Sequence, residues 1–431
     1  MKSKSLLLFC LTVIGSSLFS CSEIEQDMLI VENNAKSEAE FVSDGNVLTT
    51  LEAADIANQA YSSFFPVQSR SASVHLMADA SDVSIMNGNS SRSDSGDTLI
   101  YIVNFPKDGG YALVAAPRSC QERVLAVVPE GNLDADGSTD NPGLKMFLKD
   151  ALTYASTYAI DPGIGVTPQP MPEWYVKVDT LANSKIGQHK GLAWGQSSIY
   201  GKYCDNNACG CFATAAAMAM AYFKGPQSMD IAFKNNIKES VTKKINIDWN
   251  DILKHKSNSS SSASYNALEN ISLICRQFGE LSNADYSKPR STPIGLKEGR
   301  NSLKNLLKNK TISNYAQFNP KKHEYKVDEI KSSLGNNGLA FMCGVNYNAE
   351  DTTAHIWLVE EYKYVQIRYQ TYERQNSTFP WKLKEESFVS HDYFYHNWGW
   401  DGSGNGYFST LSGAVGVNNK KYTDLVYMTI K

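Results

Sequence analysis

The feature that most constrains this chain is an alanine-rich segment, residues 210–223, which begins with a glycine and a cysteine. After Gly210 the residues are strong helix formers and almost all apolar, which predicts a buried helix. Cys211 lies in its first turn, where unpaired backbone N–H groups and the positive end of the helix dipole favour a thiolate over a thiol. This position predicts a nucleophile. The alternative interpretation is a small buried cysteine that starts a core helix.

A thiolate nucleophile needs a base, and the chain has 7 histidines. Only His355 begins a strongly apolar segment after a polar turn, which places its imidazole at the mouth of a buried strand. His391 and His396 are rival bases, but both lie in the strand and hairpin segment that also holds the candidate orienting residue. The other histidines are expected to lie away from the site: His75, His189, His255 and His323.

Two further segments supply the groups that a cysteine–histidine pair requires. Asn397 and Trp398 open a segment rich in tryptophan and glycine; the Asn oxygen can accept the imidazole N–H, and the Trp can shield that bond from water. Gln196 lies 211 − 196 = 15 positions before Cys211, and its amide could pair with the Cys211 backbone N–H to hold an oxyanion. The alternative is a Trp-rich hairpin that only packs.

In this order, the motifs Gly-Cys-Phe-Ala-Thr-Ala, Ala-His and Asn-Trp-Gly-Trp-Asp-Gly resemble the streptopain family of papain-fold cysteine proteases, over about residues 191–431. The separation 355 − 211 = 144 also falls in the range of about 130 to 150 of the papain group. The resemblance makes Cys211 the nucleophile, His355 the general base and acid, Asn397 and Trp398 the orienting pair, and Gln196 the oxyanion donor. It implies an α+β fold, in which a papain-like catalytic domain has a helical lobe and an antiparallel β lobe. It implies no metal or organic cofactor.

The chain departs from the family pattern in three ways. Ala354 stands where the family usually has glycine, and the segment between His355 and Asn397 is longer than usual, with polar residues from 370 to 386. Two cysteines, Cys204 and Cys209, lie close to the nucleophile and could pair with each other. A bond between Cys209 and Cys211 is geometrically unfavourable and would abolish activity. None of these departures removes a catalytic group.

The first part of the chain, residues 46–160, predicts a small α+β unit, and its residues 98–129 resemble the inhibitory pro-domain of the streptopain family. Periodicity predicts helices over 51–65 and 145–158 and strands over 98–105, 110–116 and 124–128. Residues 161–172 hold four prolines and two glycines, which is typical of an exposed linker. We expect a linker with the activation cleavage region at 161–185 and the protease domain at 186–431.

The N-terminus predicts a lipoprotein signal peptide at residues 1–21. Lys2 and Lys4 precede a short apolar region that ends in Leu-Phe-Ser-Cys, which resembles a bacterial lipobox with Cys21 as the lipidated residue. Residues 22–45 are mostly polar and acidic and predict a flexible tether. We therefore expect a precursor anchored by lipid in the bacterial cell envelope, at the outer membrane or surface. Cleavage of the linker would release the mature enzyme unless the two parts stay associated.

Composition excludes one class of partner. The net charge of −4 and pI near 6.0 give no electrostatic case for nucleic acid. The sequence thus predicts a cysteine endopeptidase zymogen that acts on proteins or peptides, with its own pro-domain as intramolecular inhibitor. Two alternatives remain open: a catalytically inactive, surface-binding lipoprotein on a protease-like fold, and a different Cys-His acyltransferase.

Overall fold

The computed structural model describes residues 47–66, 77–87, 98–159, 173–234, 239–287, 292–317, 327–347, 352–374, 378–410 and 424–431. The predicted lipidation site Cys21, the tether and the residues 161–172 lie outside this part of the chain. The helices are α1 Thr50–Phe64, η1 Ala80–Asp82, α2 Pro142–Tyr158, α3 Cys211–Phe223, α4 Trp249–Ile252, α5 Tyr265–Leu281, α6 Leu296–Leu306 and α7 Val327–Gly335. The strands are β1 Val83–Asn87, β2 Thr98–Asn104, β3 Tyr111–Ala115, β4 Val124–Val128, β5 Glu173–Gly187, β6 Ser228–Lys234, β7 Ser240–Asn246, β8 Ala316–Gln317, β9 Leu339–Tyr347, β10 Thr352–Arg374, β11 Lys382–Asn397, β12 Gly406–Ser409 and β13 Asp424–Ile430.

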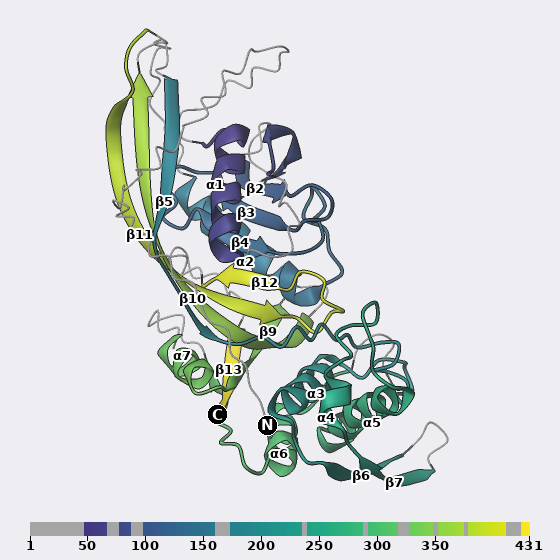
Figure 1. The fold of residues 1–431 in the computed structure, drawn as a ribbon. Helices are drawn as coiled ribbons and strands as arrows, with labels where there is room; N and C mark the ends of the chain where they lie inside the picture. Colours follow the sequence, from purple (N-terminus) through teal and green to yellow (C-terminus); the bar gives the residue numbers. More distant parts are fainter. Residues whose placement is uncertain are drawn as a thin grey trace, which may run out of the picture. The chain divides into compact units, whose positions relative to one another are not determined.

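One antiparallel sheet runs through both predicted domains (Figure 1). Its strand order is β1-β2-β3-β4-β12-β11-β10-β9-β13-β8, and β5 pairs with β10 beside this path. The junction between the two halves is β4 against β12, where Val127 is the partner of Tyr407 and Ala126 that of Phe408. The predicted pro-domain therefore does not form a separate sheet, because its strands continue the sheet of the catalytic half.

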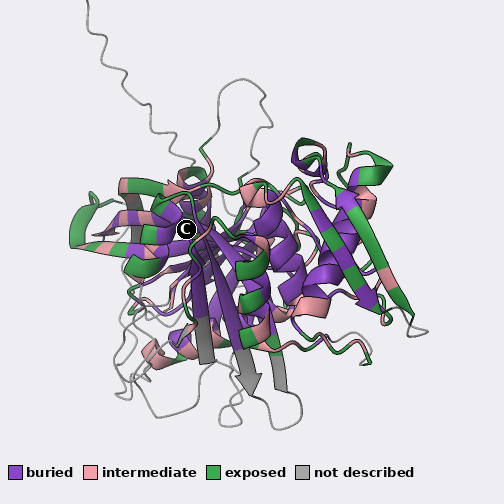
Figure 2. Cartoon of the chain, turned by 90° about the horizontal axis from the view of Figure 1, so that it is seen from below, coloured by how far each residue is buried: buried purple, intermediate pink, exposed green. Residues whose placement is uncertain are grey.

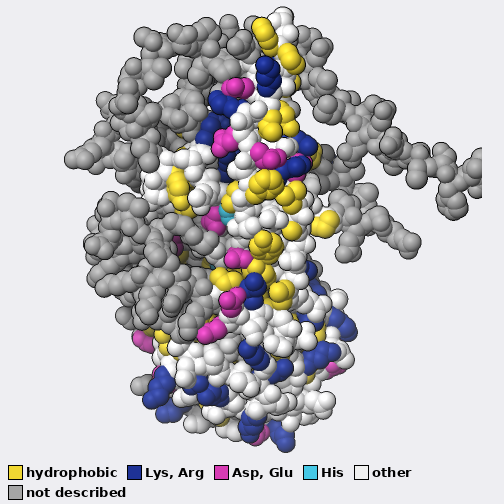
Figure 3. All heavy atoms as spheres, turned by 90° about the vertical axis from the view of Figure 1, so that its left-hand side faces the viewer, with side chains coloured by type: hydrophobic (Ala, Val, Ile, Leu, Met, Phe, Trp, Pro, Cys, Tyr) yellow, Lys and Arg dark blue, Asp and Glu magenta, His cyan; other side chains and the backbone are white. Residues whose placement is uncertain are grey.

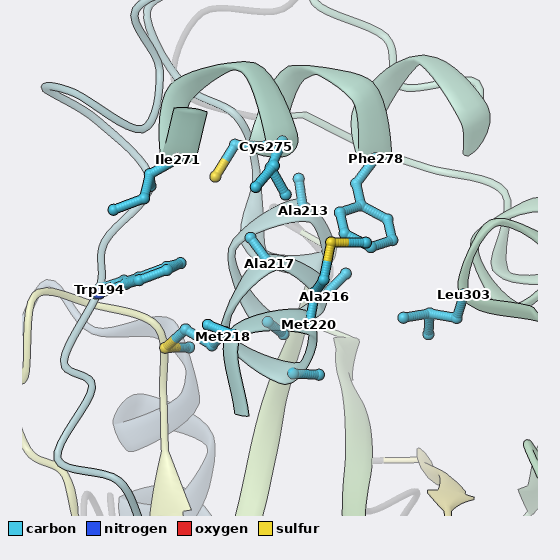
Figure 4. Packing of buried hydrophobic residues seen from close by; sticks show 14 of the residues in the cluster. Trp194, Ala213, Ala216, Ala217, Met218, Met220, Ile271, Cys275, Phe278 and Leu303 are labelled. Carbon is cyan, nitrogen blue, oxygen red and sulfur yellow. The ribbon is translucent and has the colours of Figure 1, made fainter. Parts of the chain in front are cut away.

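The helical lobe is built around α3, which begins at Cys211 and ends at Phe223 as predicted. Every residue from 212 to 221 is buried, because the alanines let neighbouring elements approach from all sides. Helix α5 packs on one side of α3, as Figure 4 shows for Ile271, Cys275 and Phe278. The hairpin β6–β7 closes the lobe, and the alternation of buried and exposed residues along β6 is visible in Figure 2. The predicted division into a helical lobe and a β lobe is confirmed.

A three-stranded ribbon of β5, β10 and β11 extends from the β lobe. Residues 354–359 and 362–369, which the sequence suggests as two strands, lie in the single strand β10, and β11 pairs with it from Asn397 back to Lys382. The segment between His355 and Asn397, which is longer than the family usually has, thus forms the far part of this ribbon. Large hydrophobic side chains are exposed there, and Figure 3 shows such side chains along the face that the ribbon forms. They are Leu181, Phe379, Trp381, Leu383 and Phe388.

The predicted linker is wrong over its second half. Residues 173–187 form β5, which pairs with β10 from Glu173 opposite Arg374 to Gly187 opposite Glu361. The reason lies in the sequence from Glu173 onward, where aromatic and β-branched residues are frequent and proline is absent. A composition signal that is strong in residues 161–172 does not extend to residue 185.

Helix α2 begins three residues earlier than predicted. Asn141 is its N-cap and Pro142 occupies its first turn, a combination that favours a helix start. Among the helices of the described segments, none has the length and apolar character that crossing a bilayer would need.

Candidate active site

Cys211 lies at the N-terminus of α3, partly exposed, and its backbone geometry depends on the residue before it. Gly210 has φ +89°, and a Cβ there would lie 2.8 Å from the Cβ of Thr292, so only glycine fits. Backbone N–H groups near the thiol, that of Ile356 foremost, act to lower its pKa. Burial nevertheless raises the pKa of the Cys211 thiol above its ordinary value. In this state the sulfur is therefore a protonated thiol.

His355 lies in β10, one residue before the N–H that contacts the nucleophile, and only 1% of its surface is exposed. Its Nε2–H donates to the backbone carbonyl of Trp398 at 2.8 Å, which leaves Nδ1 as the nitrogen with a lone pair. Burial lowers the pKa of His355 to about 4, although the bond to the Trp398 carbonyl raises it. The imidazole is therefore neutral, with one tautomer fixed.

The nucleophile and the base are thus brought to the same place but are not joined. The Cys211 sulfur contacts the backbone of Ile356, next to His355, and within the described residues no hydrogen bond links the sulfur to the imidazole. A thiol with a raised pKa beside an imidazole with a lowered pKa is the neutral pair rather than the thiolate–imidazolium pair.

The N-terminus of α2 covers His355. Asn141 caps this helix by accepting from the Gly143 N–H at 3.0 Å, and its Nδ2 donates to the carbonyl of Ser403 at 2.8 Å. A Cβ on Gly143 would lie 2.2 Å from Cε3 of Trp398 and 3.0 Å from Cδ2 of His355. Backbone from the predicted pro-domain therefore lies directly on the candidate base and its partner. Asn141 and Gly143 were not predicted as site residues, although the Asn-Pro-Gly sequence carried a helix-start signal.

The Asn397 side chain has hydrogen-bond partners other than the imidazole, and its predicted orienting role stays a prediction for the processed enzyme. Its Nδ2 donates to the carbonyl of Leu192 and to Oε1 of Glu360 at 3.1 Å, and its Oδ1 accepts from Gly399 and Asn405. The side chain thus braces the surrounding loops rather than the imidazole. The acceptor for the imidazole N–H is instead the backbone carbonyl of the next residue, Trp398.

Trp398 contacts the candidate base through its backbone carbonyl, and the predicted shielding role of its ring stays a prediction. Its indole N–H donates to Gly404 at 2.9 Å, and its backbone N–H donates to Oδ1 of Asn405 at 2.9 Å. Its ring packs on Trp357, with ring centroids 4.9 Å apart. These contacts hold the carbonyl that orients His355.

Gln196 and the preceding Gly195 accept hydrogen bonds from α3 and from the segment that leads into it. The Gln196 carbonyl accepts from the N–H of Cys209 at 2.8 Å, and the Gly195 carbonyl accepts from Oγ1 of Thr214 at 2.9 Å. The side-chain Nε2 of Gln196 is buried and has no hydrogen-bond partner. An unpaired buried donor close to the nucleophile matches the predicted oxyanion role, since such donors usually find partners.

The other described histidines are engaged elsewhere. The ring of His255 bonds the Tyr200 hydroxyl at 2.9 Å, and Nδ1 of His391 lies 3.3 Å from Oε1 of Glu122 in a buried hydrogen bond. Burial lowers the pKa of His396 to about 3, and that ring stacks on Phe408. The rival bases are therefore not at the thiol; His75 and His323 lie outside the described residues. Within the described residues, His, Cys, Asp and Glu do not gather in a group that could hold a metal ion.

Comparisons with known proteins identify a family for the catalytic half of the chain. Residues 194–408 match the sequence model of the Peptidase C10 family. A fragment of prointerpain A from Prevotella intermedia has 17% identity and a TM-score of 0.47, and the match covers 80% of this chain and 98% of that one. Active interpain A cysteine protease from the same organism has 16% identity and a TM-score of 0.38, over 57% of this chain and 94% of that one. No curated protein gave a significant match. Because residues 194–408 contain all the catalytic candidates, the family match identifies the chain as a member of the Peptidase C10 family, a cysteine-type peptidase.

Proposed function

We propose that this chain is the precursor of a lipid-anchored cysteine endopeptidase, held inactive by residues 46–160. The observation that carries the proposal is the contact of Gly143 with His355 and Trp398. This contact supports the proposal, because backbone of the predicted pro-domain packs against the candidate base and would hinder access to it. The membrane anchor at Cys21 and a location in the bacterial cell envelope rest on the sequence of the N-terminus.

Several contacts support an intramolecular inhibitor that is integral to the fold. Lys363 in β10 donates to the carbonyl of Phe64 at 2.9 Å and so caps the C-terminal end of α1. Glu122 pairs with His391 at 3.3 Å and accepts from Ser409 at 2.7 Å, all buried. Such pairs stabilise only when both partners stay in place. Release of the pro-domain would therefore break polar contacts as well as the pairing of β4 with β12.

The proposed mechanism starts when the pro-domain leaves. His355 takes the proton of Cys211 and becomes an imidazolium that stabilises the thiolate. The thiolate attacks the peptide carbonyl, Gln196 and the Cys211 N–H hold the oxyanion, and His355 gives its proton to the leaving amine. Water then hydrolyses the acyl-enzyme. The Trp398 carbonyl keeps the Nε2–H in place throughout.

The proposal is tested by incubating the purified precursor beside its Cys211→Ala form. We expect the precursor to convert itself to a shorter form that digests casein, and the variant to stay intact. N-terminal sequencing should place the new end before Glu173, since the bonds of β5 are held in the sheet. A precursor that is cut by an added protease, yet neither digests casein nor reacts with a peptide electrophile, would instead be an inactive binding protein.

Gly143→Ala should loosen the inhibitory contact. In most helices this change stabilises by up to about 1 kcal/mol. Here the new Cβ would meet Trp398 at 2.2 Å, and overpacking of this kind costs about 2 kcal/mol. Self-processing of the precursor should therefore be about 30-fold faster, followed by gel electrophoresis. Lys145→Ala on the exposed face of α2 is the matched control and should leave the rate unchanged. Equal rates for both variants would remove Gly143 from the inhibitory contact.

Lowering the pH should reduce the free energy of unfolding of the precursor, because His355 becomes protonated more easily in the unfolded chain. The folded pKa of about 4 lies below the ordinary value of 6.5, so the unfolded chain binds more protons between these values. The contribution of this group is complete above pH 6.5 and is lost as the pH falls toward 4. Between pH 7 and pH 5 it should reduce the free energy of unfolding by about 2 kcal/mol. Urea unfolding of Cys211→Ala beside Cys211→Ala with His355→Gln measures this; equal losses of stability in the two proteins would contradict it.

A further inference from the structure

A buried glutamate, Glu360, lies in β10, the strand that carries His355, and has no part in the catalytic steps above. Only 3% of its surface is exposed. The pairing of β10 with β11 shifts between Val359 and Glu361, which makes Glu360 the extra residue of a β-bulge. A bulge takes a side chain out of the alternation of its strand, and bulges are frequent beside active sites.

The carboxyl group of Glu360 is only half satisfied. Its Oε1 accepts from Nδ2 of Asn397 at 3.1 Å, whereas its Oε2 is buried and has no hydrogen-bond partner among the described residues. A carboxyl group buried in this way costs stability, because water cannot solvate the unpaired oxygen. A side chain that costs stability and contacts a candidate site residue is expected to serve the site rather than the fold.

The surroundings of Glu360 keep its carboxyl group neutral. Burial raises its pKa to about 8; the hydrogen bond from Asn397 lowers the pKa, and the charge of Glu361 raises it. The other titratable groups that interact with it are Tyr222 on α3 and Tyr395 on β11. Burial raises the pKa of both tyrosines, so both are neutral near pH 7. Glu360 therefore acts on Asn397 as an uncharged acceptor.

Asn397 links Glu360 to the peptide unit that holds the imidazole. Its Oδ1 accepts from the backbone N–H of Gly399 at 3.3 Å. The same peptide unit carries the carbonyl of Trp398, which accepts from Nε2 of His355 at 2.8 Å. Because a peptide unit is planar, the direction of its N–H fixes the direction of its carbonyl. The Asn397 amide therefore sets the orientation of the group that holds the base.

The Asn397 amide needs Glu360 to keep this orientation. Its Nδ2 also donates to the carbonyl of Leu192, so Glu360 and this carbonyl together take both N–H groups. Without Glu360, the second N–H would have only the weak sulfur acceptor of Met218, at 3.5 Å. A buried N–H without a good acceptor is costly, so the amide would turn and its oxygen would leave the Gly399 N–H.

We propose that Glu360 is a positioning residue of the active site, which holds the Asn397 side chain and through it the peptide unit that orients His355. This inference rests on the proposed function, because it assigns Glu360 a part in the same reaction. Glu360 acts on the base through Asn397, so its effect should appear in kcat rather than in KM.

The test compares Glu360→Met with the parent, as precursor and after processing by an added protease. Methionine fills a buried space of similar length but offers only a weak acceptor. For a fluorogenic peptide, kcat should fall by about 10- to 100-fold while KM changes little. The Tm of the precursor should stay within about 3 °C of the parent value, because an apolar group replaces a half-unpaired buried carboxyl. A merely structural residue would lower the Tm and leave kcat unchanged.

Two further variants separate the acceptor from the charge. Glu360→Gln keeps the acceptor and cannot ionise, so it should retain kcat at pH 7 and also above pH 8, where the parent loses activity as the Glu360 carboxyl ionises. Glu361→Gln is the matched control in the same strand, since that carboxyl contacts Tyr407 and Lys185 rather than Asn397. It should keep the kcat of the parent at pH 7.

A double-variant cycle shows whether Glu360 acts through Asn397. Glu360→Met added to Asn397→Ala should lower kcat no further than Asn397→Ala alone, because both changes release the same peptide unit. A parent that does not cleave the peptide would overturn the proposed function together with this inference.

An active parent with an unchanged kcat in Glu360→Met, or with additive losses in the double variant, would overturn the role of Glu360 alone. If Glu360→Met does not fold, the pH profile decides. Equal losses of activity above pH 8 in the parent and in Glu360→Gln would then overturn the inference.

Discussion

His355→Ala in the processed enzyme is expected to lower kcat/KM by about 10⁴-fold or more, since the members of a nucleophile–base unit fail together. The imidazole is the one described histidine whose position, beside the N–H of Ile356, brings it to the Cys211 sulfur. Without it, the thiol keeps its proton at neutral pH and no group remains to protonate the leaving amine. Hydrolysis of a fluorogenic peptide measures the loss.

The matched control for this variant is His189→Ala. That ring stacks on Tyr395 with centroids 4.7 Å apart and has no contact with the nucleophile. Its removal should change kcat/KM by no more than about twofold, because surface substitutions away from such features are close to neutral. If His355→Ala kept a tenth of the parent activity, the base would have to be another group.

Gln196→Ala is expected to lower kcat by about 10²- to 10³-fold while KM changes little, because the amide acts on the oxyanion and not on the ground state. The precursor should fold normally, since the buried Nε2 has no partner to lose. The hydrogen bond from the Cys209 N–H is also kept in this variant, because its acceptor is the Gln196 backbone carbonyl. Steady-state kinetics of the processed variant separate kcat from KM.

Gln188→Ala provides the control for the glutamine. This residue is exposed and contacts Lys190 through its side chain at 2.8 Å. It should retain the kcat of the parent enzyme. An unchanged kcat in Gln196→Ala would mean that a different donor holds the oxyanion, and the buried amide would then need another explanation.

Local sequence patterns predicted the helix that carries the candidate nucleophile. Helix α3 has the bounds expected from its alanines and from Gly210, because composition and backbone requirement agree there. Motif order predicts the pairing of Cys211 with His355, which stays a prediction. It does not predict that the Trp398 carbonyl accepts the imidazole N–H in this structure, because that depends on whether a side chain or the next carbonyl faces the imidazole. That is decided by the register of β11 and by the turn at Gly399, which has φ +66°.

Local sequence patterns also could not predict how extensively the predicted pro-domain contacts the catalytic half of the chain. The pairing of β4 with β12 joins Val127 to Tyr407, 407 − 127 = 280 positions apart, and neither strand has a feature that marks its neighbour. The close approach of Gly143 to Trp398 is equally distant in sequence. The strand β5, by contrast, could have been found, because aromatic and β-branched residues follow closely after Pro172.

The central claim is that removal of the pro-domain converts a neutral thiol and a neutral imidazole into an ion pair. The most direct measurement is the rate of Cys211 alkylation by iodoacetamide from pH 5 to pH 10, in the precursor and in the processed enzyme. The precursor should react only where an ordinary or weaker acid ionises, at about pH 9 and above, because burial raises the pKa of its thiol. The processed enzyme should already react at about pH 6, as thiolates paired with imidazolium do. Equal pH profiles for the two forms would contradict the account.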